Sequence, residues 1–370
     1  MIFLDNASTT KMSDNAITEF VRVNQQTPYN PSAQYVLGIN AHKVICNAKE
    51  EILKMLYGDG NVIFTGSATE SNNQVLSSFA SKKGKILISA GEHPSVYNVA
   101  KEFEQKGYNT SVVKLDKITG QVNIEDFMEK MTPDVNFISI IHVSNETGAI
   151  NDIKSLVEIA KSVNPKVVFH SDGVQAFGKI LVDVTDLDID LYTISAHKIC
   201  GPKGVGALYV RKGLALKPFI IGGGQELGLR SGTENTAGIA SFVIAAKEKA
   251  ENTKIIMKNL EYVQKLSDTL KKQASAMFPK FSINGSGSPY VISCRFGDMR
   301  GETLLHALET KQIFIGNGSA CSSKKAENRV LMEMGIDQKD REKSVRISFS
   351  TDNTVKEVKY LVDEIKEILG

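Results

Sequence analysis

Short runs of apolar and β-branched residues alternate with longer amphipathic segments through the first two thirds of the chain. Uninterrupted apolar runs of this length are typical of strands that are covered on both faces of a sheet. Amphipathic segments between them, such as 153–163, suit the helices that connect parallel strands. The pattern therefore predicts an α/β architecture with a largely parallel sheet, in which the strands are 61–65, 85–89, 137–141, 166–170 and 191–194.

The pattern changes after about residue 250. A long charged helix is expected at 251–277, and Val358, Leu361, Ile365 and Ile368 lie near helical spacing in the last segment. The remaining elements expected here are strands at 291–296 and 345–349 and helices at 302–309 and 355–369. This mixture predicts a second, smaller α+β domain.

Composition and charge exclude several classes of function. The chain has 370 residues, enough for about two domains, and it is 42% hydrophobic and 23% charged. The net charge is only +2 and no long basic stretch exists, which disfavours a nucleic acid or a membrane surface as the main partner. The first residues lack the pattern of a signal peptide, and no apolar run approaches membrane-spanning length.

The four cysteines, Cys46, Cys200, Cys294 and Cys321, are far apart and form no CxxC pair. Neither a zinc site nor a disulfide framework is therefore expected, and a reducing cytoplasm is the simplest compartment. Cys321 differs from the others because it lies among small and polar residues, just before two lysines. Exposure and nearby cations favour an ionised, reactive thiol, so we expect Cys321 to be a nucleophile and the other three cysteines to be structural.

Three expected strand ends carry side chains suited to one cofactor. The strand at 61–65 runs into Gly66-Ser67-Ala68-Thr69, where a glycine, small hydroxyl residues and a helix start would form an anion cup. The alternative is plain N-capping by Ser67 or Thr69. The segment is neither a Walker loop nor a GxGxxG fingerprint, so a nucleotide is not implied.

Asp172 follows the strand expected at 166–170, where open α/β sheets place ligand groups. Its carboxylate could keep a heteroaromatic ring nitrogen protonated, or it could be a solvated loop residue. Lys198 follows the next strand, beside the glycine-rich segment 201–206, and could form a Schiff base with a carbonyl, although most lysines are surface groups. An anion cup, a ring-nitrogen carboxylate and such a lysine together are the requirements of pyridoxal phosphate.

Three further polar residues are candidates for the same site. His93 follows a strand and could stack on a cofactor ring and move protons, or make one loop hydrogen bond. Asn145 could bind a ring oxygen or the substrate, or merely build a turn. Arg346 interrupts an apolar strand, which suggests a bidentate partner such as a substrate α-carboxylate, with a structural ion pair as the alternative.

With these motifs the chain resembles the cysteine desulfurases, which belong to the class V aminotransferase group of fold-type I pyridoxal-phosphate enzymes. The resemblance covers nearly the whole chain, and its motifs are specific in combination: Ala68-Thr69-Glu70-Ser71, Glu92-His93, Asn145-Glu146-Thr147-Gly148, Ser195 to Lys198, Arg230-Ser231-Gly232-Thr233 and Gly318-Ser319-Ala320-Cys321. The last motif is similar to that of the subgroup that serves iron–sulfur clusters and tRNA thiolation.

The resemblance implies a large domain at 15–250 with a mainly parallel seven-stranded sheet. It implies a small domain, made of 1–14 and 251–370, that carries a mobile loop with the active cysteine. It also implies a homodimer, because Thr233 would reach the cofactor phosphate of a second subunit.

The resemblance also implies a role for each candidate residue. Lys198 would hold the cofactor covalently and shuttle the Cα proton, and Cys321 would attack the substrate sulfur. Around the ring, Asp172 would pair with the pyridinium nitrogen, Gln175 with the ring hydroxyl, and His93 would stack. The phosphate would be held by Ala68, Thr69, Ser195 and His197, and the substrate carboxylate by Asn145 and Arg346.

The implied reaction removes sulfur from L-cysteine, gives L-alanine and leaves a persulfide on Cys321. The sulfur would pass to an acceptor protein, either an iron–sulfur scaffold or a tRNA-thiolating enzyme. No metal site is expected, apart from Cys321 as a transient ligand of an iron–sulfur cluster. The alternatives are a selenocysteine lyase, an aminotransferase or a cysteine-sulfinate lyase of the same fold, and a non-catalytic assembly subunit.

Three features depart from the family pattern. The glycine of the phosphate cup, Gly66, lies one place earlier than is common in the family, and Tyr35 stands where histidine is usual. The chain ends directly after its last expected helix, whereas members that feed a cluster scaffold often carry a longer tail. This last feature slightly favours a dedicated acceptor over a cluster scaffold.

Overall fold

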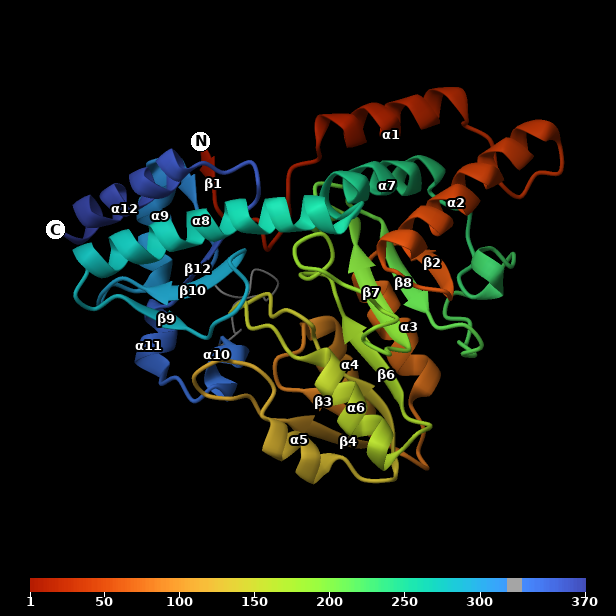
Figure 1. Cartoon of the computed structure of the whole chain (residues 1–370), viewed down its shortest axis with the longest axis horizontal. Helices are drawn as coiled ribbons and strands as arrows, with labels where there is room; N and C mark the ends of the chain where they lie inside the picture. The colour runs from red at the N-terminus through yellow and green to blue at the C-terminus, as the bar shows by residue number, and fades with distance from the viewer. Residues whose placement is uncertain (318–327) are drawn as a thin grey trace.

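A seven-stranded sheet forms the centre of the computed structural model, which describes residues 1–317 and 328–370 (Figure 1). Its strands are β2 (Asn61–Thr65), β3 (Lys85–Ser89), β4 (Asn109–Val113), β5 (Val135–Ser139), β6 (Val168–Asp172), β7 (Leu191–Ser195) and β8 (Gly206–Val210). The spatial order is β2-β8-β7-β6-β5-β3-β4. Strand β8 is antiparallel to β2 and β7, and the other neighbours are parallel, which confirms the predicted architecture.

The predicted strands agree with the observed ones at 61–65 and 85–89 and are shifted by two residues at β5 and β6. Strand β6 extends through His170 and Ser171 to Asp172, whose backbone pairs with Thr193 of β7. Asp172, expected just past the end of the strand, is therefore its last residue, and the alternative of a solvated loop residue is wrong. The predicted strand ended too early because we placed its end where the apolar run ends. His170, Ser171 and Asp172 are polar, yet they are buried, and the strand continues through them.

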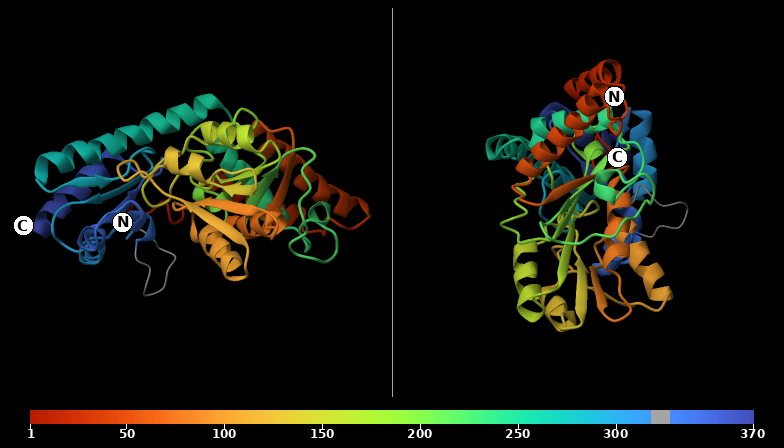
Figure 2. Two further views of the ribbon diagram at one scale, coloured as in Figure 1. Left: turned by 90° about the horizontal axis from the view of Figure 1, so that it is seen from below. Right: turned by 90° about the vertical axis from the view of Figure 1, so that its right-hand side faces the viewer.

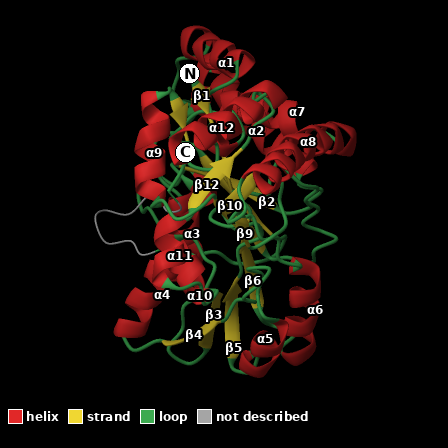
Figure 3. Cartoon of the chain, turned by 90° about the vertical axis from the view of Figure 1, so that its left-hand side faces the viewer, coloured by secondary structure: helices red, strands yellow, loops and turns green. Residues whose placement is uncertain are grey.

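Helices cover both faces of this sheet, as the strand pattern requires (Figure 3). They are α2 (Val36–Met55), α3 (Ala68–Phe79), α4 (Pro94–Gln105), α5 (Ile124–Lys130), α6 (Ile153–Val163) and α7 (Thr236–Ala250). Helix α1 (Asp14–Gln26) packs on α7 and α2 instead of on the sheet. Because side chains alternate along a strand, Ile86 and Ile88 of β3 pack in one cluster with Val75 of α3 and Val96 of α4. Leu87 joins the cluster on the other face, which includes residues of α5 and α6.

A second group of elements packs around its own core, beside the first (Figures 1 and 2). It contains an antiparallel sheet of β9 (Ser282–Asn284), β10 (Val291–Arg295) and β12 (Val345–Ser348), in the order β12-β10-β9. Its helices are α8 (Thr253–Met277), α9 (Gly301–Thr310), α11 (Gln338–Lys343) and α12 (Val355–Leu369). The short helix α10 (Arg329–Glu333) packs instead on Ala90 and Leu115 of the first group. The predicted helix at 355–369 is confirmed, and it begins with a capping box formed by Thr354 and Glu357.

The N-terminus joins this second group, because β1 (Ile2–Phe3) pairs in parallel with β11 (Ile313–Phe314). Leu4 is fully buried in the same core. The domain boundaries inferred above, 15–250 and 1–14 with 251–370, stay a prediction. None of the helices in the described part of the chain combines the length and the apolar character that a membrane span needs.

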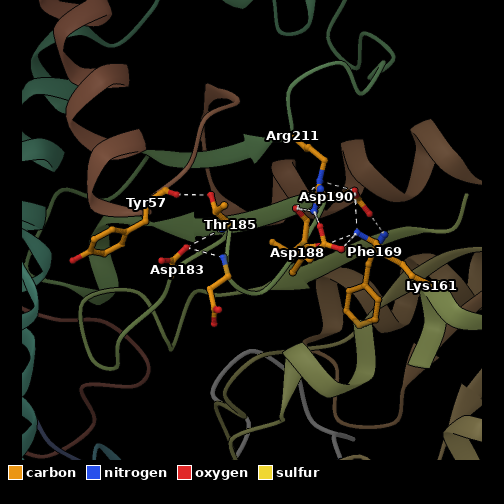
Figure 4. A network of polar contacts seen from close by, with 10 residues as sticks. Tyr57, Lys161, Phe169, Asp183, Thr185, Asp188, Asp190 and Arg211 are labelled. Carbon is orange, nitrogen blue, oxygen red and sulfur yellow. Dashed lines mark hydrogen bonds and ion pairs between the residues drawn. The ribbon is translucent and has the colours of Figure 1, made fainter. Parts of the chain in front are cut away.

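A polar network joins the amino ends of β6 and β7 to the carboxyl end of the antiparallel strand β8 (Figure 4). The Asp190 carboxylate accepts a hydrogen bond from the Phe169 N–H at 2.8 Å and pairs with Arg211 at 2.9 Å. Asp188, which has a positive φ of 51°, pairs with Arg211 and with Lys161. These contacts fix the segment that enters β7, at the end of the sheet opposite to the candidate site described next.

Candidate active site

A cavity of about 200 Å³ lies at the carboxyl ends of the central strands. It is bordered by residues from β6 and β7, by the start of α3 and α4, by the N-terminal segment and by β12. Ten of the candidate residues named from the sequence line it: Ala68, Thr69, His93, Asn145, Asp172, Gln175, Ser195, His197, Lys198 and Arg346. Residues far apart in the chain meet here because parallel strands present their carboxyl ends at one edge of the sheet.

The turn between β2 and α3 forms the expected cup. Ser67 caps α3 by accepting a hydrogen bond from the Glu70 N–H, which bears out the capping alternative for this residue. Ala68 and Thr69 follow in the first turn, where backbone N–H groups lack partners inside the helix and the helix dipole is positive. Capping by Ser67 and an anion cup at the next two residues are therefore compatible.

Two further contacts hold this turn. The Glu70 carboxylate accepts a hydrogen bond from the Gly66 N–H at 2.9 Å and pairs with Arg230 at 2.9 Å. Gly206, at the start of β8, lies against the backbone of this turn. A Cβ at this position would be 2.5 Å from the Ser67 carbonyl carbon and 2.7 Å from the Ala68 nitrogen. A glycine at position 206 thus lets β8 pack directly against the backbone of the cup.

Lys198 lies at the end of a short 3₁₀ turn, η1 (Ala196–Lys198), that follows β7. Its Nζ donates hydrogen bonds to the carbonyl oxygens of Ala7 and Ser8, each at 2.6 Å. The neighbouring His197 hydrogen-bonds through Nδ1 to the Thr9 hydroxyl at 3.1 Å. Burial, reinforced by nearby lysines, lowers the pKa of His197 to about 4, so its imidazole is neutral at pH 7.

Asp172 is buried rather than solvated, with an exposed fraction of 3%. One carboxylate oxygen accepts a hydrogen bond from Asn72 Nδ2 at 2.8 Å, and the other accepts one from the Val174 N–H at 3.0 Å. Asn72 Nδ2 also donates to the Ser95 hydroxyl, which in turn hydrogen-bonds His93 Nδ1 at 2.8 Å. A chain of hydrogen bonds thus connects the candidate ring-nitrogen carboxylate with the candidate stacking histidine.

His93 is the N-cap residue of α4, and its Nδ1 also accepts a hydrogen bond from the Ser95 N–H at 3.2 Å. A ring nitrogen that accepts a backbone hydrogen bond carries no proton, so the neutral imidazole is protonated at Nε2. Burial is the main cause that lowers the pKa of His93, and Lys198 and Arg329 lower it further, whereas Asp172 opposes them.

Arg346, on β12, is 2% exposed and makes the structural ion pair that was the alternative inferred from the sequence. Its Nη2 lies 2.7 Å from the Asp5 carboxylate, and its Nη1 donates to the Asn145 carbonyl oxygen at 2.8 Å. Its buried Nε has no hydrogen-bond partner among the described residues. Because the side chain also lines the cavity, the ion pair does not exclude a role in ligand binding.

Of the candidate residues that the structure describes, Thr233 is not brought into this cavity. Thr233 is exposed and borders a separate depression together with residues 28–31. Cys321 lies outside the described residues. Of the cysteines interpreted as structural, Cys200 and Cys294 are buried, and burial raises the pKa of both thiols.

Sequence reasoning missed Asn72, Ser95 and Lys179. Asn72 and Ser95 link Asp172 to His93, and Lys179 donates a hydrogen bond to Gln175 Oε1. The first two looked like ordinary residues of helix starts. Lys179 carried one signal that we did not use: it lies four residues after Gln175 in a segment of otherwise small and apolar residues.

Comparison with known proteins agrees with this geometry. Residues 2–361 match the model of the family described as Aminotransferase class-V. A relative from Lactobacillus delbrueckii subsp. bulgaricus, named NifS/IcsS protein homolog, is 37% identical over 100% of this chain and 97% of its own length. Cysteine desulfurase IscS 1 of Archaeoglobus fulgidus is 34% identical over the same shares of both chains.

Solved structures resemble the fold over almost its full length. A structure described as a NifS-like protein superposes with a TM-score of 0.91 at 31% identity and covers 100% of this chain and 99% of its own. Another, described as SspA in complex with cysteine, gives a TM-score of 0.82 at 27% identity and covers 96% of this chain and 100% of its own.

Pyridoxal phosphate is the cofactor of this family, and the residues present fit it. The cavity offers a helix N-terminus for a phosphate, a buried carboxylate in Asp172 for a ring nitrogen, and a lysine in Lys198. The chain therefore belongs to the aminotransferase class-V family and has the fold of the fold-type I pyridoxal-phosphate-dependent transferases.

Proposed function

We propose that the protein is a cysteine desulfurase, which takes the sulfur of L-cysteine, releases L-alanine and carries the sulfur as a persulfide on Cys321. The observation that supports this most directly is the meeting of Lys198, Asp172 and the start of α3 at one cavity that also contains a buried arginine, Arg346. The relatives named cysteine desulfurase, which match over the full length of this chain, support the same reaction.

In this proposal the cofactor is held by groups from several strand ends. Pyridoxal phosphate supplies an electron sink for the electrons released when a bond at the substrate Cα breaks. The backbone at Ala68 and Thr69, with Ser195 and His197, holds the phosphate. His197, whose Nδ1 is held by the Thr9 hydroxyl, has its other ring nitrogen available for the phosphate.

The side chains around the ring have separate tasks. Asp172, held by Asn72 and by the Val174 N–H, keeps a negative charge beside the ring nitrogen. His93 stacks on the ring, and its Nδ1 is fixed by Ser95. Gln175 faces the ring oxygen. Each of these groups is buried or nearly so, which strengthens its interaction with the ligand because little water competes.

The substrate carboxylate binds Arg346 and Asn145. The Arg346 guanidinium is pre-oriented, because Asp5 and the Asn145 carbonyl oxygen hold two of its nitrogens. A guanidinium has five N–H donors in a fixed plane, so it can bind a carboxylate while it keeps these contacts. Fixing the carboxylate in this way brings the Cα–H bond within reach of Lys198, which takes up the Cα proton.

The sulfur is transferred to Cys321. Its thiolate attacks the substrate sulfur, so that an S–S bond forms as the Cβ–Sγ bond breaks. The electron pair of the broken bond stays with the organic fragment, which takes up one proton at Cβ, regains the Cα proton from Lys198 and leaves as L-alanine. A second protein then receives the sulfur from the persulfide, either an iron–sulfur scaffold or a tRNA-thiolating enzyme.

We further infer that the protein works as a homodimer, in which Thr233 of each subunit completes the phosphate site of the other. Its exposed position, away from the cavity of its own chain, supports this arrangement. A reducing compartment such as the cytoplasm suits the chemistry, because Cys321 must return to a thiol between turnovers.

The test is the release of sulfide and alanine from L-cysteine under reductant, measured for the wild type beside Cys321→Ala. Cys46→Ala is the matched control, because Cys46 is partly exposed and distant in sequence from every candidate site residue. We expect equimolar sulfide and alanine from the wild type and the control, and neither product from Cys321→Ala.

If Cys321→Ala released as much sulfide and alanine as the wild type, no persulfide on Cys321 would be needed, and the protein would be a lyase. A protein that binds pyridoxal phosphate but releases no product from L-cysteine would contradict the proposed substrate. Mass spectrometry adds an independent measurement, because a persulfide adds one sulfur atom, about 32 Da, to the peptide that contains Cys321.

A further inference from the structure

Lys179 is a buried cation next to the cofactor cavity, and it has no part in the mechanism proposed above. It is 6% exposed, and its Nζ lies 5.8 Å from the centre of the Tyr290 ring. Burying a cation costs free energy unless specific contacts compensate for the lost hydration. Its one hydrogen bond to a described side chain goes to Gln175 Oε1.

Gln175 has partners at both ends of its amide. Its Oε1 accepts the hydrogen bond from Lys179, and its Nε2 donates one to the Ala7 carbonyl oxygen at 2.9 Å. An ammonium group only donates and a carbonyl oxygen only accepts, so the two partners select the same orientation of the amide. The flipped orientation would place N–H groups against the Lys179 ammonium and two oxygens against each other.

The selected orientation leaves one N–H hydrogen of Gln175 for a ligand. An amide nitrogen carries two hydrogens, and the structure gives Nε2 a single acceptor, the Ala7 carbonyl oxygen, among the described residues. Gln175 lines the same cavity as Asp172 and Lys198. The side chain therefore presents a hydrogen-bond donor, and not its oxygen, toward an acceptor on a ligand in the cavity.

We propose that Lys179 is a positioning residue, which holds the Gln175 amide so that an N–H group faces the ring oxygen of bound pyridoxal phosphate. The proposal rests on the cofactor role of Gln175 given above, and it does not depend on which amino acid is the substrate. Lys179 acts through Gln175 and does not itself touch the cofactor.

The surroundings of Lys179 agree with this role. Burial is the main cause that lowers its pKa to about 7, and the positive charges of Lys198 and Arg346 act in the same direction, whereas Cys200 opposes them. A lysine amine has hydrogens to donate in both of its protonation states, so it can serve Oε1 in either. Lys249 and Tyr290 also lie near Lys179, but the hydrogen bonds of the Gln175 amide within the described part of the chain go to Ala7 and Lys179.

A double-mutant cycle on cofactor binding tests the proposal. The dissociation constant of pyridoxal phosphate is measured by titration of the apoprotein for the wild type, Lys179→Met, Gln175→Ala and the double variant. Loss of one hydrogen bond in a buried site weakens binding by roughly tenfold. We expect each single variant to weaken binding by about this factor, and the double variant to be no weaker than Gln175→Ala alone.

Additive effects, which would give the double variant a loss of about a hundredfold, would show that Lys179 acts independently of Gln175 and would overturn the proposal. Wild-type affinity in Lys179→Met would overturn it as well. If Lys179→Met does not fold, Lys179→Gln takes its place in the cycle. Lys179→Arg, which keeps a donor and a charge, is expected to restore affinity to within about threefold of the wild type.

The absorption spectrum of the bound cofactor separates this role from a purely structural one. Lys179→Met and Gln175→Ala should change the spectrum in the same direction, because the first loosens and the second removes the hydrogen bond from Gln175 to the ring oxygen. A lower unfolding midpoint for Lys179→Met with an unchanged spectrum would instead show that Lys179 only stabilises the fold.

Discussion

Substitution of Asn72 by alanine should destabilise the folded protein much more than the same substitution at the adjacent Asn73. Asn72 is fully buried, and its Nδ2 donates to the Asp172 carboxylate at 2.8 Å and to the Ser95 hydroxyl at 2.9 Å. Asn73 is only partly buried, and its Nδ2 donates to the Thr69 carbonyl oxygen at 2.8 Å and, over a longer distance of 3.4 Å, to the Ser95 carbonyl oxygen. Both residues lie in the interior of α3, so the gain in helix propensity on replacement by alanine is the same for both.

The magnitude follows from the hydrogen bonds that the substitution removes. A hydrogen bond to a charged group contributes about 1.5–3 kcal/mol and a neutral one about 1 kcal/mol. Asn72 Oδ1 is buried without a hydrogen-bond partner among the described residues. Its removal therefore stabilises the folded state by about 1 kcal/mol and offsets part of the loss. The net loss for Asn72→Ala is therefore about 1.5–3 kcal/mol, and it exceeds the loss for Asn73→Ala, whose hydrogen bonds are partly exposed to water, by about 1–2 kcal/mol.

The measurement is urea unfolding of the apoprotein for wild type, Asn72→Ala and Asn73→Ala, followed by circular dichroism. Repeating it at several concentrations of pyridoxal phosphate reports cofactor affinity, because a ligand of the native state stabilises it by RT ln(1 + [L]/Kd). We expect Asn72→Ala also to bind the cofactor more weakly, since Asp172 loses one of its two donors. A difference between the two variants below about 1 kcal/mol would refute this account of the Asp172–Asn72–Ser95 chain.

Two further predictions concern the phosphate cup and a buried carboxyl. Gly206→Ala should weaken binding of pyridoxal phosphate by about tenfold or more, yet leave binding of unphosphorylated pyridoxal unchanged, because a Cβ there displaces the Ser67 backbone. Titration with both ligands checks this, with Gly297→Ala as the control, and equal losses for both would contradict it. Burial raises the pKa of Glu92 from 4.5 to about 8, so the folded protein favours the neutral carboxyl group. The stabilisation that the neutral group contributes is complete below pH 4.5 and is lost as the pH rises through 8. The stability of Glu92→Gln relative to wild type should therefore increase from pH 5 to pH 8 in urea unfolding, whereas a constant difference would speak against the raised pKa.

Much of the fold could be predicted because many helices and strands are specified by residues that are close together in the sequence. The runs at 61–65 and 85–89 are apolar and short, and they coincide with β2 and β3. The helices at 153–163 and 355–369 were predicted with their observed bounds, since their apolar residues repeat at helical spacing and begin after capping residues. Patterns of this kind depend on neighbours in sequence, which is why they were readable without the tertiary structure.

The candidate site was predictable in part for the same reason. Asp172, Ser195 and Lys198 follow apolar runs, and the topology of a parallel sheet brings such strand ends together. Arg346 was conspicuous because a charged residue interrupts an apolar strand. His93 was a candidate because it follows a strand, and the family pattern added Gln175, whose local sequence alone does not distinguish it from an ordinary loop residue.

The sequence by itself thus determined which elements form and which strand ends carry reactive side chains. Only the tertiary structure decided how those side chains are held. Asn72 acts through Asp172 and Ser95, which lie on other elements, and the role of Lys179 depends on its burial beside the cavity that Gln175 lines. The pair of Asp5 and Arg346 joins residues 341 positions apart, and it forms because the first strand returns to the second core. Hydrogen bonds depend on distances of about 3 Å and on direction, and between segments remote in sequence these are set by packing alone.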